Sequence, residues 1–484
     1  MKIEQSSFFL KIAYKWKVFF AIGVSLFTSV ASVSMVFVAL SDIAYSFDKS
    51  LKDVSLVVII HGLTICALIL PMGRLADIVG RKKIFIFGLV ISTLGLLFSA
   101  YSPSFSFLVF SRILTGVGNA MAQSVGTAML VSVFPNNERG KAIGSQTTAV
   151  SIGAATGPVI SGLVLQFYSW QFLFFLTFIP SLISLIFSYV IIDESAVSEK
   201  TASKNNFDWI GSLLSGIFVI LFIGLINNPY EIPTNSFLFY SLSLLVIFLL
   251  LFFIFWELRI DNPMLQLRLF KNYVFTSAVV ARFLGFSATT AVRISIPIYL
   301  ITVKTISEAS TGILLFFSSL FMGIAAQSVG RLADKFSERP FSIFGFFILI
   351  LTIISFSTFN LSTNMIVISF TIIINGFAQG LWNVPNSSTI MGSVPSTYRG
   401  VIGAFTNLTR NFGNVFGQAV IASVIAAVMI SEGFDVPLDE IKNNPDALLS
   451  FLNGWRYAFY LIALFAFGGL SLSIFTKFTN EESK

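Results

Sequence analysis

The chain has 484 residues, of which 55% are hydrophobic and only 11% are charged, and its formal net charge is +7. About a quarter of the residues in a soluble domain are charged, so this composition excludes a large soluble domain. The positive charge could suggest a nucleic-acid partner, but the Lys and Arg residues stand in short segments between apolar runs, where they orient membrane proteins. We therefore expect a lipid bilayer around this chain and no nucleic acid bound to it.

Residues with catalytic or metal-binding chemistry are scarce. Cys66 is the only cysteine and His61 the only histidine, so neither an intrachain disulfide nor a cysteine metal site can form. We find no nucleophile elbow, metal-ligand cluster or phosphate-binding glycine loop. The sequence predicts that the protein is not an enzyme and needs no metal or cofactor.

Apolar runs dominate the chain from beginning to end. A run of about 18–25 apolar residues can cross a hydrocarbon layer of about 30 Å. The first run is longer than the apolar part of a signal peptide, so we interpret it as a retained helix. The sequence predicts an all-α polytopic membrane protein with about fourteen transmembrane helices, at 18–41, 54–72, 84–101, 106–131, 142–166, 169–192, 208–227, 236–256, 273–302, 310–330, 341–359, 364–388, 402–430 and 455–476.

The distribution of cations predicts the orientation. An even number of helices places both termini on one side of the membrane. With the N-terminus inside, about 21 Lys and Arg residues fall in inside segments and about five in outside segments. We predict a multi-pass protein of the cytoplasmic (plasma) membrane with both termini in the cytoplasm. We expect a flexible linker at 193–208 and an outer loop at 431–454, with a candidate short surface helix.

An internal repeat organises the sequence. Residues 73–83, Gly-Arg-Leu-Ala-Asp-Ile-Val-Gly-Arg-Lys-Lys, have a weaker copy at 330–335. The offset of about 260 residues also relates further motifs: Gly116 to Gly376, Arg139-Gly140 to Arg399-Gly400, and Gly153 and Gly157 to Gly413 and Gly417. We predict two six-helix bundles as parallel repeats, 1–195 and 273–484, separated by a linker and two extra helices at 196–272. Transporters of this kind bind substrate between the halves.

The repeated motif predicts a conformational latch. We expect a tight turn at the membrane surface, in which Gly73 and Gly80 allow close approach or a positive φ. The Asp77 carboxylate can pair with a nearby cation or with the N-terminus of another helix in one conformation only. The alternative is a solvated loop charge. The candidate latch residues are Gly73, Arg74, Asp77, Gly80, Arg81, Gly330, Arg331 and Asp334.

Small residues mark the fifth predicted helix. Gly153, Gly157 and Gly162 allow close approach of a neighbouring helix, which we expect across the interface between the bundles. Pro158 removes a backbone donor and can bend the helix. The motif predicts tight packing; a role in gating is the additional hypothesis.

Four arginines lie inside predicted helices, where each costs about 2.5–3.5 kcal/mol unless it faces a cavity or a partner. We expect Arg112 and Arg282 to lie deepest, and for Arg293 and Arg410 the alternative is a side chain that extends to the membrane surface. No Asp or Glu falls in the body of a predicted helix: Glu257 lies at a helix end, and Asp77 and Asp334 are expected in loops. This imbalance favours an anionic or a neutral hydrogen-bonding substrate.

Polar and aromatic side chains supply candidates for the central cavity. His61 could carry a proton, but a neutral imidazole bonded to a neighbouring helix is the interpretation we prefer. Polar groups inside helices can join neighbours or line a cavity, and Trp382 would suit an aromatic substrate. The cavity and coupling candidates are His61, Arg112, Gly116, Arg282, Arg293, Trp382, Asn383, Asn386, Asn407 and Arg410.

At these residues the chain resembles the major facilitator superfamily, and within it the fourteen-helix drug:proton antiporter (multidrug efflux) branch. Residues 73–83 resemble the signature loop between its second and third helices. Arg112 with Gly116 resembles its fourth-helix arginine motif, and residues 153–162 its fifth-helix exporter motif. Trp256-Glu257 and the segment after it resemble the branch's connector. The chain departs from the pattern in four places: Ser32 stands for the usual first-helix Asp, Phe37 for an Asn, Thr115 for a Gln, and Ser337 for the second glycine of the copied loop.

The resemblance implies a secondary transporter that works by alternating access. Members of the branch most often export lipophilic or cationic compounds in exchange for protons. We therefore expect a small-molecule substrate, protons as the candidate coupling ion, and a monomer. The alternative is a facilitator, symporter or antiporter of an organic anion or lipid-like compound that is not coupled through a first-helix carboxylate.

Overall fold

The computed structural model describes residues 13–49, 51–197, 207–227, 232–233, 236–260, 263–395, 398–434 and 444–475. Much of the predicted linker at 193–208 lies outside the described residues. The candidate surface helix of the outer loop lies outside them as well.

Fourteen helices in the described part of the chain are long and apolar enough to cross a membrane, as the sequence predicts. They are α1 (Tyr14–Val38), α3 (Leu51–Val79), α4 (Arg81–Ala100), α5 (Phe105–Val133), α6 (Arg139–Val164), α7 (Gln171–Ile191), α9 (Trp209–Asn227), α10 (Phe237–Arg259), α11 (Tyr273–Ile298), α12 (Glu308–Phe336), α13 (Arg339–Ser357), α14 (Met365–Gly392), α15 (Arg399–Ser431) and α17 (Pro445–Phe475). The short helices α2 (Leu40–Phe47) and α8 (Glu194–Val197) lie outside this set.

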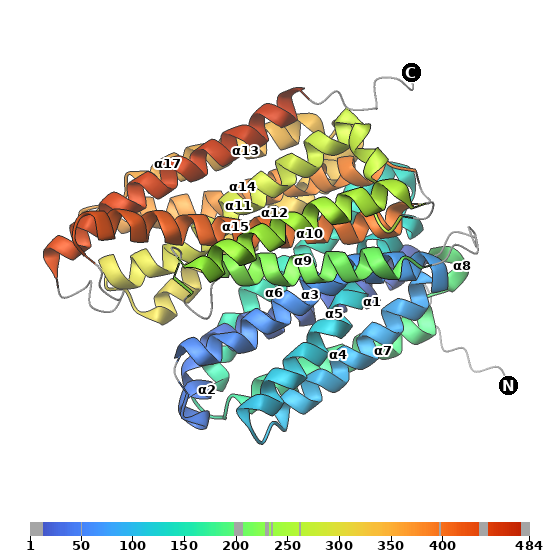
Figure 1. Cartoon of the computed structure of the whole chain (residues 1–484), viewed down its shortest axis with the longest axis horizontal. Helices are drawn as coiled ribbons and strands as arrows, with labels where there is room; N and C mark the ends of the chain where they lie inside the picture. Colours follow the sequence, from blue (N-terminus) through green and yellow to red (C-terminus); the bar gives the residue numbers. More distant parts are fainter. Residues whose placement is uncertain are drawn as a thin grey trace.

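The long helices form two halves that lie side by side. In Figure 1, α1 and α3 to α7 make up the lower half and α11 to α17 the upper half. The halves lie close together at the end of the molecule that carries α8 and diverge toward the end that carries α2. The main contacts between the halves run along α6 with α12 and along α3 with α15. These are equivalent pairs in the two repeats, so the interface has the approximate twofold character that parallel repeats imply.

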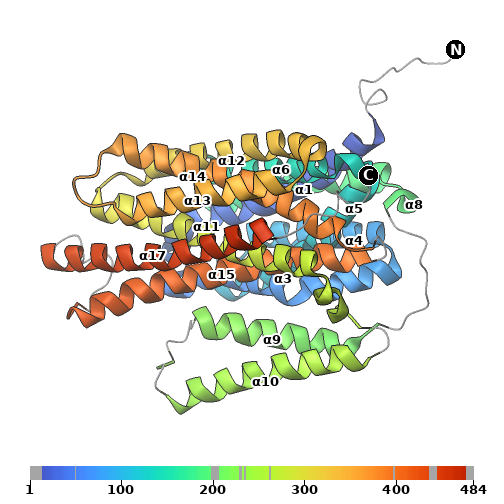
Figure 2. The same cartoon turned by 90° about the horizontal axis from the view of Figure 1, so that it is seen from above.

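The two additional helices lie outside both bundles. Figure 2 shows α9 and α10 as a separate pair beside the main body. Of the two, α9 packs on α3 and α15, one helix from each half. Two buried acids hold this pair together and fix the segment that follows it. Asp208 accepts a hydrogen bond from Trp256 Nε1 at 3.0 Å, and Glu257 accepts one from the Leu265 amide at 3.0 Å.

Matching glycine contacts show that the internal repeat extends to the tertiary structure. A Cβ atom built on Gly153 would lie 2.7 Å from the Phe27 carbonyl oxygen, and one built on Gly413 would lie 2.7 Å from the Phe283 carbonyl oxygen. The first pair joins α6 to α1 and the second joins α15 to α11. Glycine at these positions permits a backbone approach that any larger residue would prevent.

The chain reverses later than the sequence predicts after α3. The predicted turn begins at Gly73, but α3 continues helically to Val79 and α4 begins at Arg81. Gly73 is buried inside the helix, and Gly80 alone forms the break, with a φ of 115°. At the equivalent point after α12, Ser337 adopts a φ of 106° without being glycine. Asp77 and Asp334 are therefore in the last turns of helices, and their expected placement in loops is wrong.

Three further boundaries differ from the prediction. The last helix, α17, begins at Pro445, ten residues before the predicted position 455. The ninth predicted span ends in a five-residue π-helix, Tyr299–Val303. The first span ends at Val38, where a short separate helix follows. The early start of α17 has a simple reason. A search for apolar runs leaves out polar residues at a helix end, although their backbone is helical.

Candidate functional site

A carboxylate from each half bonds to a helix N-terminus of the other half. Asp77 at the end of α3 accepts a hydrogen bond from the Val401 amide at 3.2 Å, in the first turn of α15. Its second oxygen lies 3.3 Å from Arg81 Nη2. The first amides of a helix lack partners within the helix and favour negative charge, so a carboxylate fits this position. We call this contact the α3–α15 latch.

The equivalent contact on the other side of the interface is more complete. Asp334 at the end of α12 accepts hydrogen bonds from the amides of Gly140 at 2.7 Å and Lys141 at 2.9 Å, in the first turn of α6. We call this contact the α12–α6 latch. Both latches lie at the end where the two halves are close together (Figure 1). Both latches therefore join the halves at this end of the molecule.

The other predicted latch residues support these carboxylates to different degrees. Arg81 is 3% exposed and also donates to the Val197 carbonyl of α8 at 3.2 Å. Arg74 is half-buried one turn before Asp77, whereas Arg331 is exposed. A Cβ on Gly330 would lie 2.3 Å from the Gly140 carbonyl oxygen, so Gly330 allows α12 to approach the start of α6.

The glycines of α6 divide between two partners, which corrects the sequence interpretation. Gly153 and Gly157 pack against α1 inside their own half and not across the interface: a Cβ on Gly157 would lie 2.6 Å from Ser34 Cβ. The close contact with the other half comes earlier in α6, where a Cβ on Gly144 would lie 2.5 Å from the Ala326 carbonyl oxygen. Gly162 has open space, with no atom within 4 Å of its Cβ position. Pro158 stays within the continuous helix α6.

In the lower half, α5 brings Arg112 and His61 into one polar cluster. Arg112 is fully buried and lies 3.4 Å from both the Val57 carbonyl oxygen and Ser32 Oγ. One face of α5 carries Arg112, Gly116 and Asn119. Gly116 permits α5 to approach the His61 carbonyl, which lies 3.0 Å from its Cβ position. The Asn119 amide nitrogen lies 3.0 Å from His61 Nε2. An amide nitrogen only donates, so Nε2 is the acceptor and the imidazole is neutral in this arrangement.

The upper half holds a polar cluster of its own around Arg282 of α11. This guanidinium donates to the Thr406 carbonyl at 3.0 Å, to Asn383 Oδ1 at 3.0 Å and to Ser387 Oγ at 2.6 Å. Nearby, the Asn386 side chain donates to the Ala278 carbonyl at 2.9 Å. Arg282 therefore has neutral partners from two neighbouring helices, α14 and α15, and no carboxylate in the described part of the chain.

Polar side chains also meet between the halves. Gln123 of α5 accepts a hydrogen bond from Arg410 of α15 at 3.3 Å, and its backbone carbonyl accepts one from Asn407 at 3.0 Å. Arg293 lies in the second half of the span formed by α11 and its π-helix; it is exposed and donates to Thr290 Oγ1 at 3.3 Å. Asn407 and Arg410 are therefore the predicted candidates that contact the other half directly, and Arg293 lies close enough to Arg410 for the two charges to interact.

Trp382 belongs to the packing of the upper half. It is fully buried, with ring centroids 5.0 Å from Phe346 and 5.1 Å from Phe286. A Cβ on Gly285 would lie 2.7 Å from the indole ring. The ring fills the space between α11, α13 and α14, so contact with a substrate would require these helices to move.

We predict that Trp382→Ala destabilises the protein strongly, by about 3–5 kcal/mol, because a large buried ring leaves a cavity. Thermal unfolding of the purified protein measures this effect. Trp209→Ala is the matched control, because Trp209 is 75% exposed and should leave the unfolding temperature unchanged. An unchanged unfolding temperature for Trp382→Ala would contradict the packing role.

The sequence analysis did not include two amide side chains of α5: Asn119, which bonds His61, and Gln123, which bonds Arg410 of the other half. Asn119 and Gln123 follow Arg112 by seven and eleven residues, which places all three on one face of α5. That periodicity is the signal that could have found them.

Glu338 was also missed: it accepts a hydrogen bond from Ser388 at 2.8 Å, and burial raises the pKa of its carboxyl group. In the described helices, Asp and Glu residues lie only in the end turns. The prediction that no acid falls in the body of a helix is therefore confirmed for the described residues.

Comparison with known proteins identifies the family. The model of the Major Facilitator Superfamily matches residues 22–418. The chain is 27% identical to the riboflavin transporter RibZ of Clostridioides difficile, over 95% of this chain and 97% of that protein. It is 27% identical to the multidrug resistance protein Stp of Mycobacterium tuberculosis, over 84% and 75% of the two chains.

A solved structure agrees with this assignment at the level of the fold. The human organic anion transporter MFSD10 superposes with a TM-score of 0.67 at 13% identity and covers 93% of this chain and 99% of that one. The fold, the paired halves and the matched family model agree. The chain belongs to the Major Facilitator Superfamily and is a multi-pass membrane transporter, not an enzyme.

Proposed function

We propose that this transporter exports drug-like or lipophilic small molecules across the cytoplasmic membrane by alternating access. The pair of latches carries the proposal, because each joins the halves at one end by contacts that separation of the halves must break. Such an element has two states, which alternating access requires. The export direction is supported by the resemblance of residues 153–162 to the exporter motif and by the multidrug resistance protein Stp among its relatives.

A second candidate function, transport of an organic anion, is favoured by the charges between the halves. Arg293 and Arg410 lie there, and the described helices carry no acid in their middles to neutralise these groups. A cation entering this region would meet repulsion, whereas an anion or a hydrogen-bond acceptor would meet donors. The names of the relatives point to different substrates: one is a riboflavin transporter and another is a multidrug resistance protein.

Uptake into inverted membrane vesicles tests both candidates in one experiment. Labelled cationic dyes and labelled organic anions are compared, each with and without a pH gradient. Uptake that depends on the protein and on the gradient supports proton-coupled export, and the preferred class identifies the substrate charge. Gradient-independent uptake of anions alone supports the second candidate. No uptake of either class above that of vesicles lacking the protein contradicts both.

Proton coupling, if present, must use a group other than a first-helix carboxylate, since Ser32 stands there. We predict that His61→Gln leaves the pH dependence of transport unchanged, because His61 Nε2 already accepts a hydrogen bond and glutamine can supply an acceptor. Flux after a pH jump measures this. A changed pH dependence would identify His61 as the coupling site. His61→Leu, which removes the acceptor, should lower stability.

The orientation belongs to the same proposal. The first long helix begins and the last one ends at the latch side of the molecule: Lys15 pairs with Glu138 beside the start of α6, and Arg339 at the start of α13 donates to the Ile474 carbonyl of α17. The cation distribution predicts that this side faces the cytoplasm. We further propose that the chain works as a monomer in the cell membrane.

A further inference from the structure

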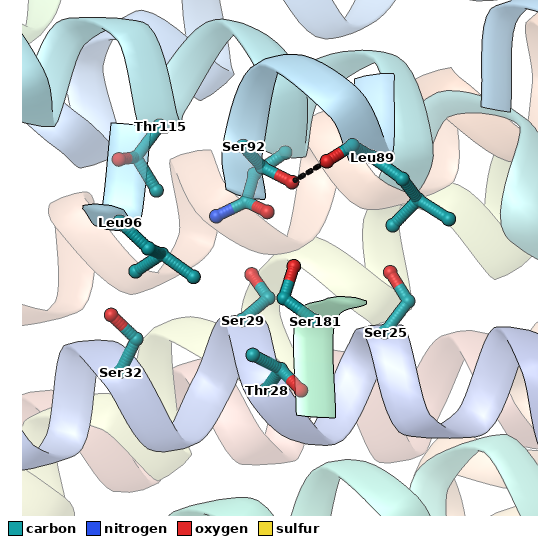
Figure 3. Close-up of a pocket in the computed structure, with 10 residues that line it drawn as sticks. Ser25, Thr28, Ser29, Ser32, Leu89, Ser92, Leu96, Thr115 and Ser181 are labelled. Atoms are coloured by element: carbon teal, nitrogen blue, oxygen red, sulfur yellow. Dashed lines mark hydrogen bonds between the residues drawn. The ribbon is translucent and has the colours of Figure 1, made fainter. Parts of the chain in front are cut away.

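A small cavity lies inside the lower half, and all of its lining residues belong to that half. It is bounded by α1, α4, α5 and α7, and seven of its ten lining residues carry a hydroxyl group. Figure 3 shows hydroxyl groups of α1 directed toward α4 and α5 across this space. The lining residues are between 1% and 7% exposed. The cavity is therefore too small for a drug-like molecule and has space for about one water-sized ligand.

A buried cation with an unused donor stands next to this cavity. Arg112 is fully buried, and its Nη1 lies 3.4 Å from Oγ of Ser32, a lining residue. Its Nη2 has no hydrogen-bond partner among the described residues. Arginine stays protonated in proteins, and a buried charge needs a counter-charge or a full set of bonds. No acid in the described chain supplies that charge, since helical acids lie only in end turns.

Two hydroxyl groups of the cavity lining, those of Ser29 and Ser32, have protons available to donate. Ser32 accepts from Arg112, and Ser29 accepts from Gln123 at 3.2 Å, so the hydroxyl proton of each is left to donate. Neither proton has an acceptor among the described residues. Thr28 differs, because its hydroxyl already donates to the Val24 carbonyl at 2.8 Å. The cavity lining thus has uncommitted hydroxyl donors and no carboxylate, and the Arg112 guanidinium lies beside it.

We propose that this cavity binds a small inorganic anion, chloride being the test ion, as the counter-ion of Arg112. A water molecule could accept the same hydrogen bonds, but it cannot neutralise the charge. The hydroxyl protons of Ser29 and Ser32 supply the ligands, and the Arg112 guanidinium beside the cavity, with its unused Nη2 donor, supplies the positive charge. This site does not depend on which substrate the transporter moves, because its lining comes from the lower half alone.

Chloride binding to the purified full-length protein tests the site. Radiolabelled chloride is titrated at constant ionic strength, with gluconate as the replacement anion, and bromide is the competitor. We expect one saturable site per chain that bromide blocks. We also expect chloride, but not gluconate, to raise the unfolding temperature of the same sample, since a ligand stabilises the state that it binds.

The decisive variant is Ser32→Asp, which places a carboxylate beside Arg112 and removes the need for an external anion. We expect about a tenfold or larger loss of chloride affinity and an unfolding temperature that no longer responds to chloride. Thr28→Val is the matched control and should keep both properties, because the Thr28 hydroxyl is already committed to the backbone. Arg112→Gln is less useful, since the loss of a fully buried side chain with several partners also lowers stability.

Three results would overturn the proposal. One is the absence of saturable chloride binding to the wild-type protein. Another is chloride affinity in Ser32→Asp equal to that of the wild type. Equal loss of affinity in Thr28→Val and Ser32→Asp would also count against it, because it would indicate general damage to the lower half.

Discussion

Asp77→Asn should reduce transport at least about tenfold while leaving the amount of protein in the membrane unchanged. The variant keeps the size of the side chain but removes the charge that faces the Val401 amide and Arg81. Hydrogen bonds to charged groups contribute about 1.5–3 kcal/mol, and each 1.4 kcal/mol changes an equilibrium tenfold. Loss of this contact therefore shifts the balance between the two conformations. Flux measured against immunoblot quantities checks the result.

Asp42→Asn is the control for this prediction, because Asp42 is exposed on α2 at the opposite end of the molecule (Figure 1). Wild-type flux in Asp77→Asn would remove the α3–α15 latch from the mechanism. Asp334→Asn should have an effect at least as large, since Asp334 holds two amides at shorter distances. The double variant should not be additive, because both carboxylates hold the same interface.

Gly157→Leu should abolish transport, since a Cβ at this position would meet Ser34 of α1 at 2.6 Å. Overpacking of a close helix contact typically costs about 1–3 kcal/mol, and the backbone must shift to relieve it. The shift would separate α6 from α1 and misplace the α6 surface that meets α12. Flux in vesicles is the measurement, with membrane quantities as the reference.

Gly162→Leu is a closely matched control: it lies on the same helix, and its Cβ position has no atom within 4 Å. It should transport normally. Gly144→Leu adds a comparison, because its Cβ would meet the Ala326 carbonyl of the other half at 2.5 Å. This variant should prevent the halves from closing without disturbing α1. Normal flux in Gly157→Leu would refute the packing argument.

The variants Gly157→Leu and Gly144→Leu also distinguish two contacts of α6, one within its own half and one with the other half, which the sequence motif does not separate. Small residues at helical spacing predict a close approach but do not name the partner helix. The partner follows from the side of α6 on which each glycine lies, and the structure assigns Gly157 to α1 and Gly144 to α12. Loss of transport in both would therefore have different causes, one within a half and one between the halves.

The sequence by itself determined the membrane-spanning class, the fourteen helices and the duplicated halves. These properties depend on apolar length and on motif spacing, which are local quantities that a chain carries without its fold. The pairing of Asp77 with a helix N-terminus was also anticipated as one of two partners, because carboxylates and unpaired amides attract wherever they meet.

Only the tertiary structure decided which groups meet. The Val401 amide lies more than 300 residues from Asp77 in the sequence, and Gln123 meets Arg410 only because α5 and α15 come from opposite halves. Trp382 shows the same limit: a tryptophan on a polar helix face could line a cavity or fill a core, and the neighbouring Phe346 and Phe286 rings settle its place. Long-range contacts depend on how helices pack, and periodicity within one helix does not specify its neighbours.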